Sequence, residues 1–144
     1  MKNIQFVKIS DSNLSTIKKL DYSNNTDYII INSNLDINLD YDKIYNKHKN
    51  DNNTITMVCG IKNIKIPYDV VEIDKLGMIE YFEETPSFTF TVNLGVYVIN
   101  SDIIPLIKDC NDELSLRKIL NISAKNKKKI GTFIYGGSIW KMVF

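Results

Sequence analysis

The chain has 144 residues, of which 44% are hydrophobic and 24% are charged, a composition typical of one compact globular domain spanning residues 1–144. Its formal net charge is +1, which excludes a strong bulk attraction to nucleic acid or to anionic membranes. Its one strong basic run, residues 127–129, is three lysines without aromatic partners and is expected to be a solvated turn.

The predicted strands share short apolar or alternating runs bounded by turn residues. The segment DYIIIN is a continuous apolar run, which indicates a strand that is covered on both faces. The segment at 68–84 is predicted to be a hairpin, with Gly77 adopting positive φ at its turn. In 88–100, Phe88, Phe90 and Val92 alternate as core positions do. The strands are predicted at 3–10, 27–32, 54–60, 68–84 (the hairpin), 88–100 and 128–135.

The predicted helices lie between these strands. They are expected at 11–20, 41–50, 101–110 and 112–126. Asp11, Ser12 or Asn13 is expected to cap the first helix and Ser101 the third. Helices that alternate with strands and one hairpin predict an α/β fold with a mixed, mainly parallel sheet flanked by helices.

Several kinds of chemistry find no support in the sequence. Cys59 and Cys110 lie far apart and outside any CxxC motif, which favours reduced thiols over a disulfide or a zinc site. The single histidine, His48, has no adjacent nucleophile or orienting carboxylate and is predicted to be structural. The N-terminus lacks the apolar core of a secretion signal and no run is long enough to span a membrane, so we expect a cytoplasmic protein.

Six short signatures occur in a recognisable order along the chain. They are the strand DYIIINSN, a helix ending in HK, IPYD, EETP, VNLG and the late WKM. In this order they resemble the sugar-phosphate nucleotidyltransferase family, whose members join a nucleoside triphosphate to a sugar 1-phosphate and release pyrophosphate. The resemblance covers nearly the whole chain. It implies the C-terminal portion of a Rossmann-like nucleotidyltransferase domain.

The resemblance implies a sugar site in the second half of the chain. Glu84 matches the glutamate of the Glu-Lys-Pro motif, which accepts hydrogen bonds from sugar hydroxyls, whereas Thr85 replaces the lysine. Asn93 and Gly95 match Asn-x-Gly, an amide for hydroxyl groups and a glycine for close approach of the sugar ring. Tyr68 matches the tyrosine of Pro-Tyr-Gly.

The metal positions depart from the family pattern. The two carboxylates that hold Mg²⁺ in the family align with Asn34 and Met142, and Mg²⁺ prefers anionic oxygen ligands. No catalytic residue and no cofactor are therefore expected, unless a nearby carboxylate such as Asp36 compensates. Asp36, Asp40 and Asp42 are better explained as caps of the following helix.

The family's glycine-rich nucleotide loop has no counterpart in this sequence, which is expected to be truncated at its N-terminus relative to the family. The resulting hypothesis is an impaired or inactive nucleotidyltransferase-like domain, a pseudoenzyme that retains sugar or sugar-phosphate binding. Two alternatives stay open. One is the acceptor-sugar half of an active enzyme, completed by a nucleotide-binding partner chain. The other is a self-associating structural protein, in which loss of the N-terminal half exposes the DYIIIN strand and favours a homo-oligomer.

Overall fold

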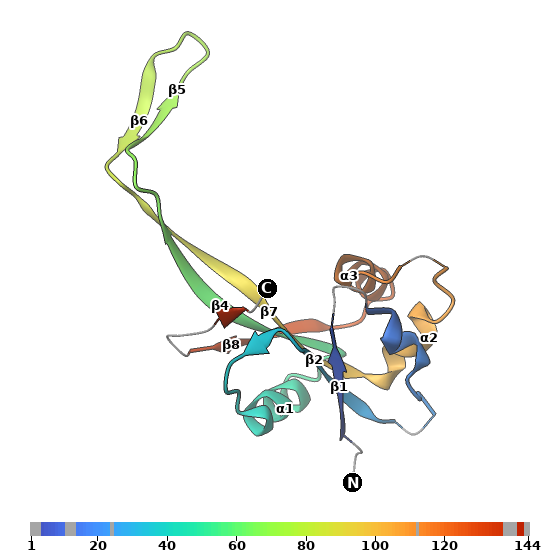
Figure 1. Ribbon diagram of the computed structural model, residues 1–144. Coiled ribbons are helices and arrows are strands. Elements are labelled where there is room, and N and C mark those ends of the chain that lie inside the picture. The colour runs from blue at the N-terminus through green and yellow to red at the C-terminus, as the bar shows by residue number, and fades with distance from the viewer. Residues whose placement is uncertain (1–3, 11–13, 24, 112, 137–140, 143–144) are drawn as a thin grey trace.

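A five-stranded sheet forms the centre of the body of the molecule (Figure 1). The computed structural model describes residues 4–10, 14–23, 25–111, 113–136 and 141–142. The sheet order is β1 (Ile4–Ile9), β2 (Asp27–Asn32), β7 (Ser87–Asn100), β4 (Ile55–Lys65) and β8 (Ile130–Tyr135). Strand β7 runs antiparallel to both of its neighbours, while β1 is parallel to β2 and β4 is parallel to β8. The predicted mixed, mainly parallel sheet is confirmed.

Helices cover both faces of the sheet (Figure 1). Helix α1 (Tyr41–Asn50) packs on one face, where Ile44 joins Ile29, Val58 and Val98 in one apolar cluster. The opposite face is covered by η1 (Leu14–Lys19), η2 (Ser101–Ile103), α2 (Ile104–Ile107) and α3 (Leu116–Lys125). Neighbouring residues of β2 point to different clusters, so this strand is buried on both faces as predicted.

Local sequence signals explain where most helices begin. Asp40 caps α1, because its Oδ1 accepts a hydrogen bond from the Lys43 amide at 3.1 Å. Ser115 caps α3 in the same way. The predicted cap at Ser101 is wrong: Asn100 accepts the hydrogen bond from the Asp102 amide, and Ser101 is buried.

The first predicted helix differs from the expectation in type. Residues 14–19 form the 3₁₀ helix η1, and the expected caps at 11–13 lie outside the described residues. Among the described residues, no helix is both long and apolar enough to cross a membrane. Cys59 and Cys110 are both free thiols, as expected.

An arm extends from the carboxyl edge of the sheet (Figure 1). We use "arm" for residues 61–92, which comprise the outer parts of β4 and β7 and the hairpin of β5 (Val70–Ile73) and β6 (Ile79–Glu83). Gly77 lies at the hairpin turn with φ +81°, as predicted. Asp74 stabilises this turn, because its Oδ1 accepts hydrogen bonds from the Leu76 and Met78 amides at 2.8 Å.

Two predictions about burial are wrong. Phe88 and Phe90 were predicted as core positions, yet they are 40% and 49% exposed, because this part of β7 belongs to the arm and has no layer packed over it. The DYIIIN strand was expected to be exposed in a self-associating protein, but β2 lies inside the sheet between β1 and β7. Most of the exposed large apolar side chains lie on the arm instead.

Candidate functional site

The carboxyl edge of the sheet collects polar side chains from strands that are distant in sequence. Strand β2 ends at Asn32, whose Oδ1 accepts a hydrogen bond from the Asn34 amide at 3.0 Å. The short strand β3 (Leu35–Asp36) follows and pairs with β9 (Lys141–Met142). Because Leu35 pairs with Met142, the backbones of Asn34 and Met142 lie at neighbouring positions.

A bulge in β7 forms the second part of this edge. The register of β4 with β7 shifts between Val58 and Cys59, which pair with Val96 and Asn93, respectively. Leu94 and Gly95 are the extra residues, and Gly95 adopts φ +81°, a conformation that glycine accepts without steric cost. The bulge marks the point where β7 leaves the arm and enters the core.

The bulge fixes the side-chain amide of Asn93. Its Oδ1 accepts a hydrogen bond from the Gly95 amide at 2.9 Å, and its Nδ2 donates to the Tyr97 Oη at 2.7 Å. Burial raises the pKa of Tyr97, the hydrogen bond from Asn93 lowers it, and the nearby Cys59 raises it further. The side chain of Asn93 is exposed. One amide hydrogen and one oxygen lone pair remain for a ligand hydroxyl group.

Gly95 also permits a close approach between two strands. A Cβ atom at this position would lie 3.0 Å from the Cβ of Asn32. The end of β2 therefore packs directly on the bulge of β7. The predicted pair Asn93 and Gly95 does lie together, beside Asn32 at the end of β2.

The other two predicted sugar residues lie together at the joint of the arm. Tyr68 belongs to the loop between β4 and β5, and Glu84 to the loop between β6 and β7; both are exposed. The two loops are joined by hydrogen bonds from the Thr85 amide to Asp69 Oδ1 (3.2 Å) and from the Ile66 amide to the Pro86 carbonyl (2.9 Å). Asp69 thus stabilises the joint between the two loops.

The two pairs are far apart. From Ser87 to Asn93 the chain runs six residues as a strand, which corresponds to about 20 Å. In this conformation of the arm, Glu84 and Tyr68 therefore do not reach a monosaccharide that contacts Asn93.

The expected metal positions do not fit Mg²⁺. Asn34 provides a neutral amide oxygen and Met142 a thioether, whereas Mg²⁺ requires hard, preferably anionic oxygen ligands. No group of three or more histidine, cysteine, aspartate or glutamate residues in the described part of the chain is arranged to hold a metal ion. Asp40 caps α1, as expected, but the same prediction for Asp36 is wrong, because Asp36 lies on β3 opposite Lys141.

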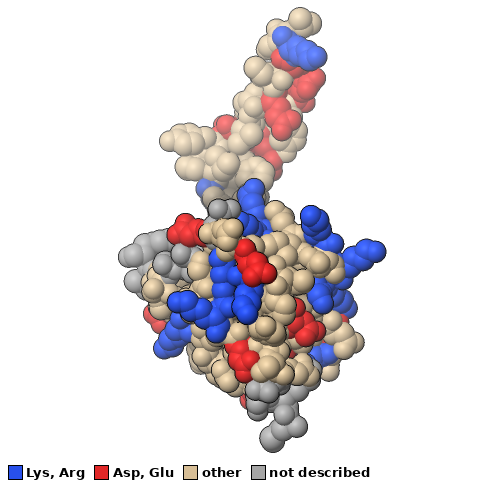
Figure 2. Space-filling view, turned by 90° about the vertical axis from the view of Figure 1, so that its right-hand side faces the viewer, with Lys and Arg blue, Asp and Glu red and all other residues tan. Residues whose placement is uncertain are grey.

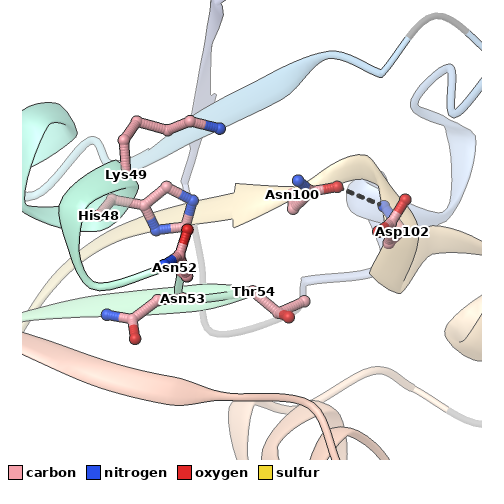
Figure 3. A pocket seen from close by; sticks show the side chains of 7 residues that line it. All are labelled: His48, Lys49, Asn52, Asn53, Thr54, Asn100 and Asp102. Atoms are coloured by element: carbon pink, nitrogen blue, oxygen red, sulfur yellow. Dashed lines mark hydrogen bonds between the residues drawn. The ribbon is translucent and has the colours of Figure 1, made fainter.

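A pocket of about 260 Å³ lies at the opposite, amino edge of the sheet (Figure 3). It is lined by His48, Lys49, Asn52, Asn53, Thr54, Asn100 and Asp102. His48 is buried, and its Nδ1 lies 2.7 Å from the Thr56 hydroxyl, which agrees with the predicted structural role. None of the sugar residues suggested by the sequence lines this pocket.

An ion pair between a buried carboxylate and a partly exposed lysine lies beside this pocket and was not found from the sequence. Asp27 is fully buried at the start of β2, where it accepts hydrogen bonds from the Tyr45 hydroxyl (2.8 Å) and from Lys49 Nζ (2.9 Å). The Tyr45 pKa is raised, first by burial and then by Asp27. The i,i+4 spacing of Tyr45 and Lys49 on α1 was the available signal, but nothing local pointed to Asp27 as their partner.

The layered sheet, with helices on both faces and polar residues at the carboxyl edge, defines a Rossmann-like α/β domain. Residues 12–143 match the sequence model of one family, described as nucleotidyl transferase. The chain belongs to this nucleotidyl transferase family. No curated protein sequence matches the chain.

Solved structures agree with this fold. A putative glucose-1-phosphate thymidylyltransferase from Bacillus anthracis, in complex with a sucrose, is 18% identical with a TM-score of 0.58, over 90% of this chain and 53% of that one. HddC from Yersinia pseudotuberculosis, complexed with GMP-PN, is 19% identical with a TM-score of 0.56, over 89% of this chain and 55% of that one. A second structure of HddC from Yersinia pseudotuberculosis is 19% identical with a TM-score of 0.53, over 83% of this chain and 52% of that one. The chain spans about half the length of these proteins.

Proposed function

We propose that this chain is a nucleotidyltransferase-fold domain that does not transfer nucleotides by itself and that binds a sugar or sugar phosphate at the carboxyl edge of its sheet. One observation carries the first part. The β3–β9 pairing brings Asn34 and Met142 to neighbouring positions, where the resemblance implies two metal-binding carboxylates. An amide and a thioether do not neutralise a triphosphate, and charge neutralisation is a main part of phosphoryl transfer catalysis.

The proposed sugar-binding group is the Asn93 amide beside Gly95. Its orientation is fixed by two internal hydrogen bonds, so little side-chain entropy is lost when a ligand binds. Its free donor and acceptor suit two adjacent hydroxyl groups. Glu84 and Tyr68 form a separate exposed pair at the arm joint, which in this proposal contacts the ligand only when the arm moves.

A thermal-shift screen of sugar phosphates, NDP-sugars and nucleoside triphosphates, with and without Mg²⁺, tests the binding. A ligand at ten times its Kd adds about 1.4 kcal/mol of stability, which raises Tm by about 4 °C. We expect this shift for a sugar phosphate without Mg²⁺ and its loss in Asn93→Ala. The matched control is Asn121→Ala, an exposed asparagine on α3. Equal ligand-induced Tm shifts in Asn93→Ala and Asn121→Ala would show that Asn93 does not bind the ligand.

A turnover assay tests the absence of catalysis. Pyrophosphate release is measured with each nucleoside triphosphate, sugar 1-phosphates and Mg²⁺. We expect none above the protein-free rate, and turnover that Asn93→Ala abolishes would overturn the proposal. Magnesium-dependent binding that is lost in Asp36→Asn would instead identify Asp36 as a compensating ligand.

A second function is favoured by the chain spanning about half of its structural neighbours. In this alternative the chain supplies the acceptor-sugar half of an active enzyme, and another chain supplies the nucleotide-binding half. Co-expression with a candidate chain that carries a glycine-rich nucleotide loop, followed by co-purification and the same turnover assay, tests it. Turnover by the mixture but by neither chain alone is the expected result, and failure to co-purify counts against it.

A cytoplasmic location belongs to the same proposal. It is supported by the two free cysteines, since thiols stay reduced in that compartment. Fractionation of cells that express the tagged full chain is the direct measurement.

A further inference from the structure

The arm exposes most of the large apolar side chains on the surface. Of the sixteen exposed large hydrophobic residues in the described part of the chain, twelve lie within residues 61–92. These twelve are Ile61, Ile64, Tyr68, Val71, Ile73, Leu76, Met78, Ile79, Tyr81, Phe82, Phe88 and Phe90. Their exposed fractions run from 40% for Phe88 to 88% for Leu76.

Strand register places many of these side chains on one face. In the ribbon of β4 and β7, Ile64 pairs with Phe88 and shares a face with Phe90, while Thr89 and Thr91 point to the other face. In the hairpin, Val71 pairs with Phe82 on one face, and Glu72 pairs with Tyr81 on the other. Each part of the arm therefore has one apolar and one more polar face.

The apolar area that the arm exposes is larger than a monomer usually leaves uncovered. Twelve such side chains, each exposing about 100 Å², give on the order of 1,200 Å² over both faces of the arm, and the apolar faces of Ile64, Phe88, Phe90, Val71 and Phe82 supply about 500 Å² of it before any other part of the chain joins the contact. The largest apolar patch of a typical monomer is about 300–600 Å², whereas each partner in a standard interface buries about 800 Å². A two-stranded ribbon without a packed layer is also marginally stable in water, so this arm needs a cover.

The charge of the molecule is divided between the arm and the body. The hairpin region, residues 69–84, holds six acidic residues and one lysine, a net charge of −5, and Lys62 and Lys65 bring the whole arm to −3; since the chain carries +1 in total, the body carries +4. Figure 2 shows acidic side chains along the arm and many lysine or arginine side chains on the visible face of the body. The acidic hairpin of one copy is thus electrostatically complementary to the basic body of another.

We infer that two copies of this chain form a two-fold symmetric dimer through their arms. The arms lie antiparallel, with the apolar faces of Phe82 and Phe90 in the contact and each acidic hairpin near the body of the partner. A two-fold axis repeats both the apolar and the charge contact, so the interface is closed. This arrangement covers the arm without any change in the body.

Sedimentation and light scattering of the full chain test the dimer. We expect about twice the chain mass of 16.6 kDa at protein concentrations near 100 µM. Phe90→Glu should weaken the dimer at least about tenfold, because it places a charge in the apolar contact. Thr91→Glu is the matched control: it adds the same charge one residue further, on the other face of the ribbon, and should change Kd by less than about threefold. Far-UV circular dichroism checks that both variants fold.

The charge contact has its own test. Glu80→Lys with Glu83→Lys should raise Kd by at least about tenfold at low salt, and added salt should weaken the unmodified dimer. A monomeric unmodified chain at 100 µM, whether or not another protein binds it, overturns the inference. Equal effects of Phe90→Glu and Thr91→Glu on the dimer Kd also overturn the inference. If the double variant Glu80→Lys with Glu83→Lys leaves the dimer Kd unchanged at low salt, the antiparallel arrangement is wrong.

Discussion

Substitution of Gly95 by alanine tests the packing of the candidate site on the end of β2. Two costs are expected. An L-residue at φ +81° costs about 1 kcal/mol. The new Cβ would also lie 3.0 Å from the Cβ of Asn32, well inside the ordinary carbon–carbon contact distance, and such overpacking costs about 1–3 kcal/mol. We therefore expect Gly95→Ala to lower the free energy of unfolding by about 3 kcal/mol and Tm by about 10 °C.

Gly77 provides a matched control. It also has φ +81°, but no atom lies within 4 Å of where its Cβ would be. Gly77→Ala should therefore cost no more than about 1 kcal/mol. The difference between the two variants isolates the contact with Asn32.

Urea denaturation followed by far-UV circular dichroism measures both variants. An effect of Gly95→Ala within about 0.5 kcal/mol of that of Gly77→Ala would refute the proposed contact. Since Gly95 donates its backbone N–H to Asn93, Gly95→Ala should also weaken any sugar-phosphate shift seen in the unmodified protein. Gly77→Ala should leave that shift unchanged.

Three further predictions follow from buried polar groups. Gly131→Ala should cost about 2 kcal/mol in urea denaturation, because its Cβ would lie 2.2 Å from Nδ2 of the buried Asn53, and Asn53→Gly should relieve part of this loss in the double variant. Lys49→Met should lower the free energy of unfolding by about 3 kcal/mol, because it leaves the buried Asp27 carboxylate uncompensated. Asp27→Asn should lower it by only about 1 kcal/mol, because the partly exposed lysine can turn to water. Equal losses in the two variants would contradict this reasoning. Burial raises the Tyr97 pKa, so the folded state keeps the phenol proton to a higher pH than the unfolded state does. The free energy of unfolding should therefore fall as pH rises above about 10. In unfolding curves measured across this pH range, Tyr97→Phe should show a smaller fall than the unmodified protein.

Local signals determined much of the body. The apolar run in β2 could only be satisfied by cover on both faces, and helices do cover it. Asp40 and Ser115 stand directly before their helices, where a side-chain oxygen satisfies free amides. Gly77 marks its turn in the same way. These features depend on residues within a few positions of one another, which is why sequence alone was sufficient.

The sequence was insufficient where a residue's surroundings come from elsewhere in the chain. Alternation in β7 predicts which side chains share a face, but not whether anything packs on that face; Phe88 and Phe90 alternate as core residues do and are exposed. Likewise, a regular strand separates the Cα atoms of Asn93 and Tyr97 by about 13 Å, and the bulge at Gly95 shortens this distance.

The sequence by itself determined the order of strands and helices, the family resemblance and the residues at the expected metal positions. Only the tertiary structure decided which of the suggested site residues meet. It joined β3 to β9 across the length of the chain, and it packed the bulge at Gly95 against Asn32 at the end of β2. The physical reason is that strand pairing over long sequence separations sets these distances, and such pairing leaves no mark on the neighbouring residues.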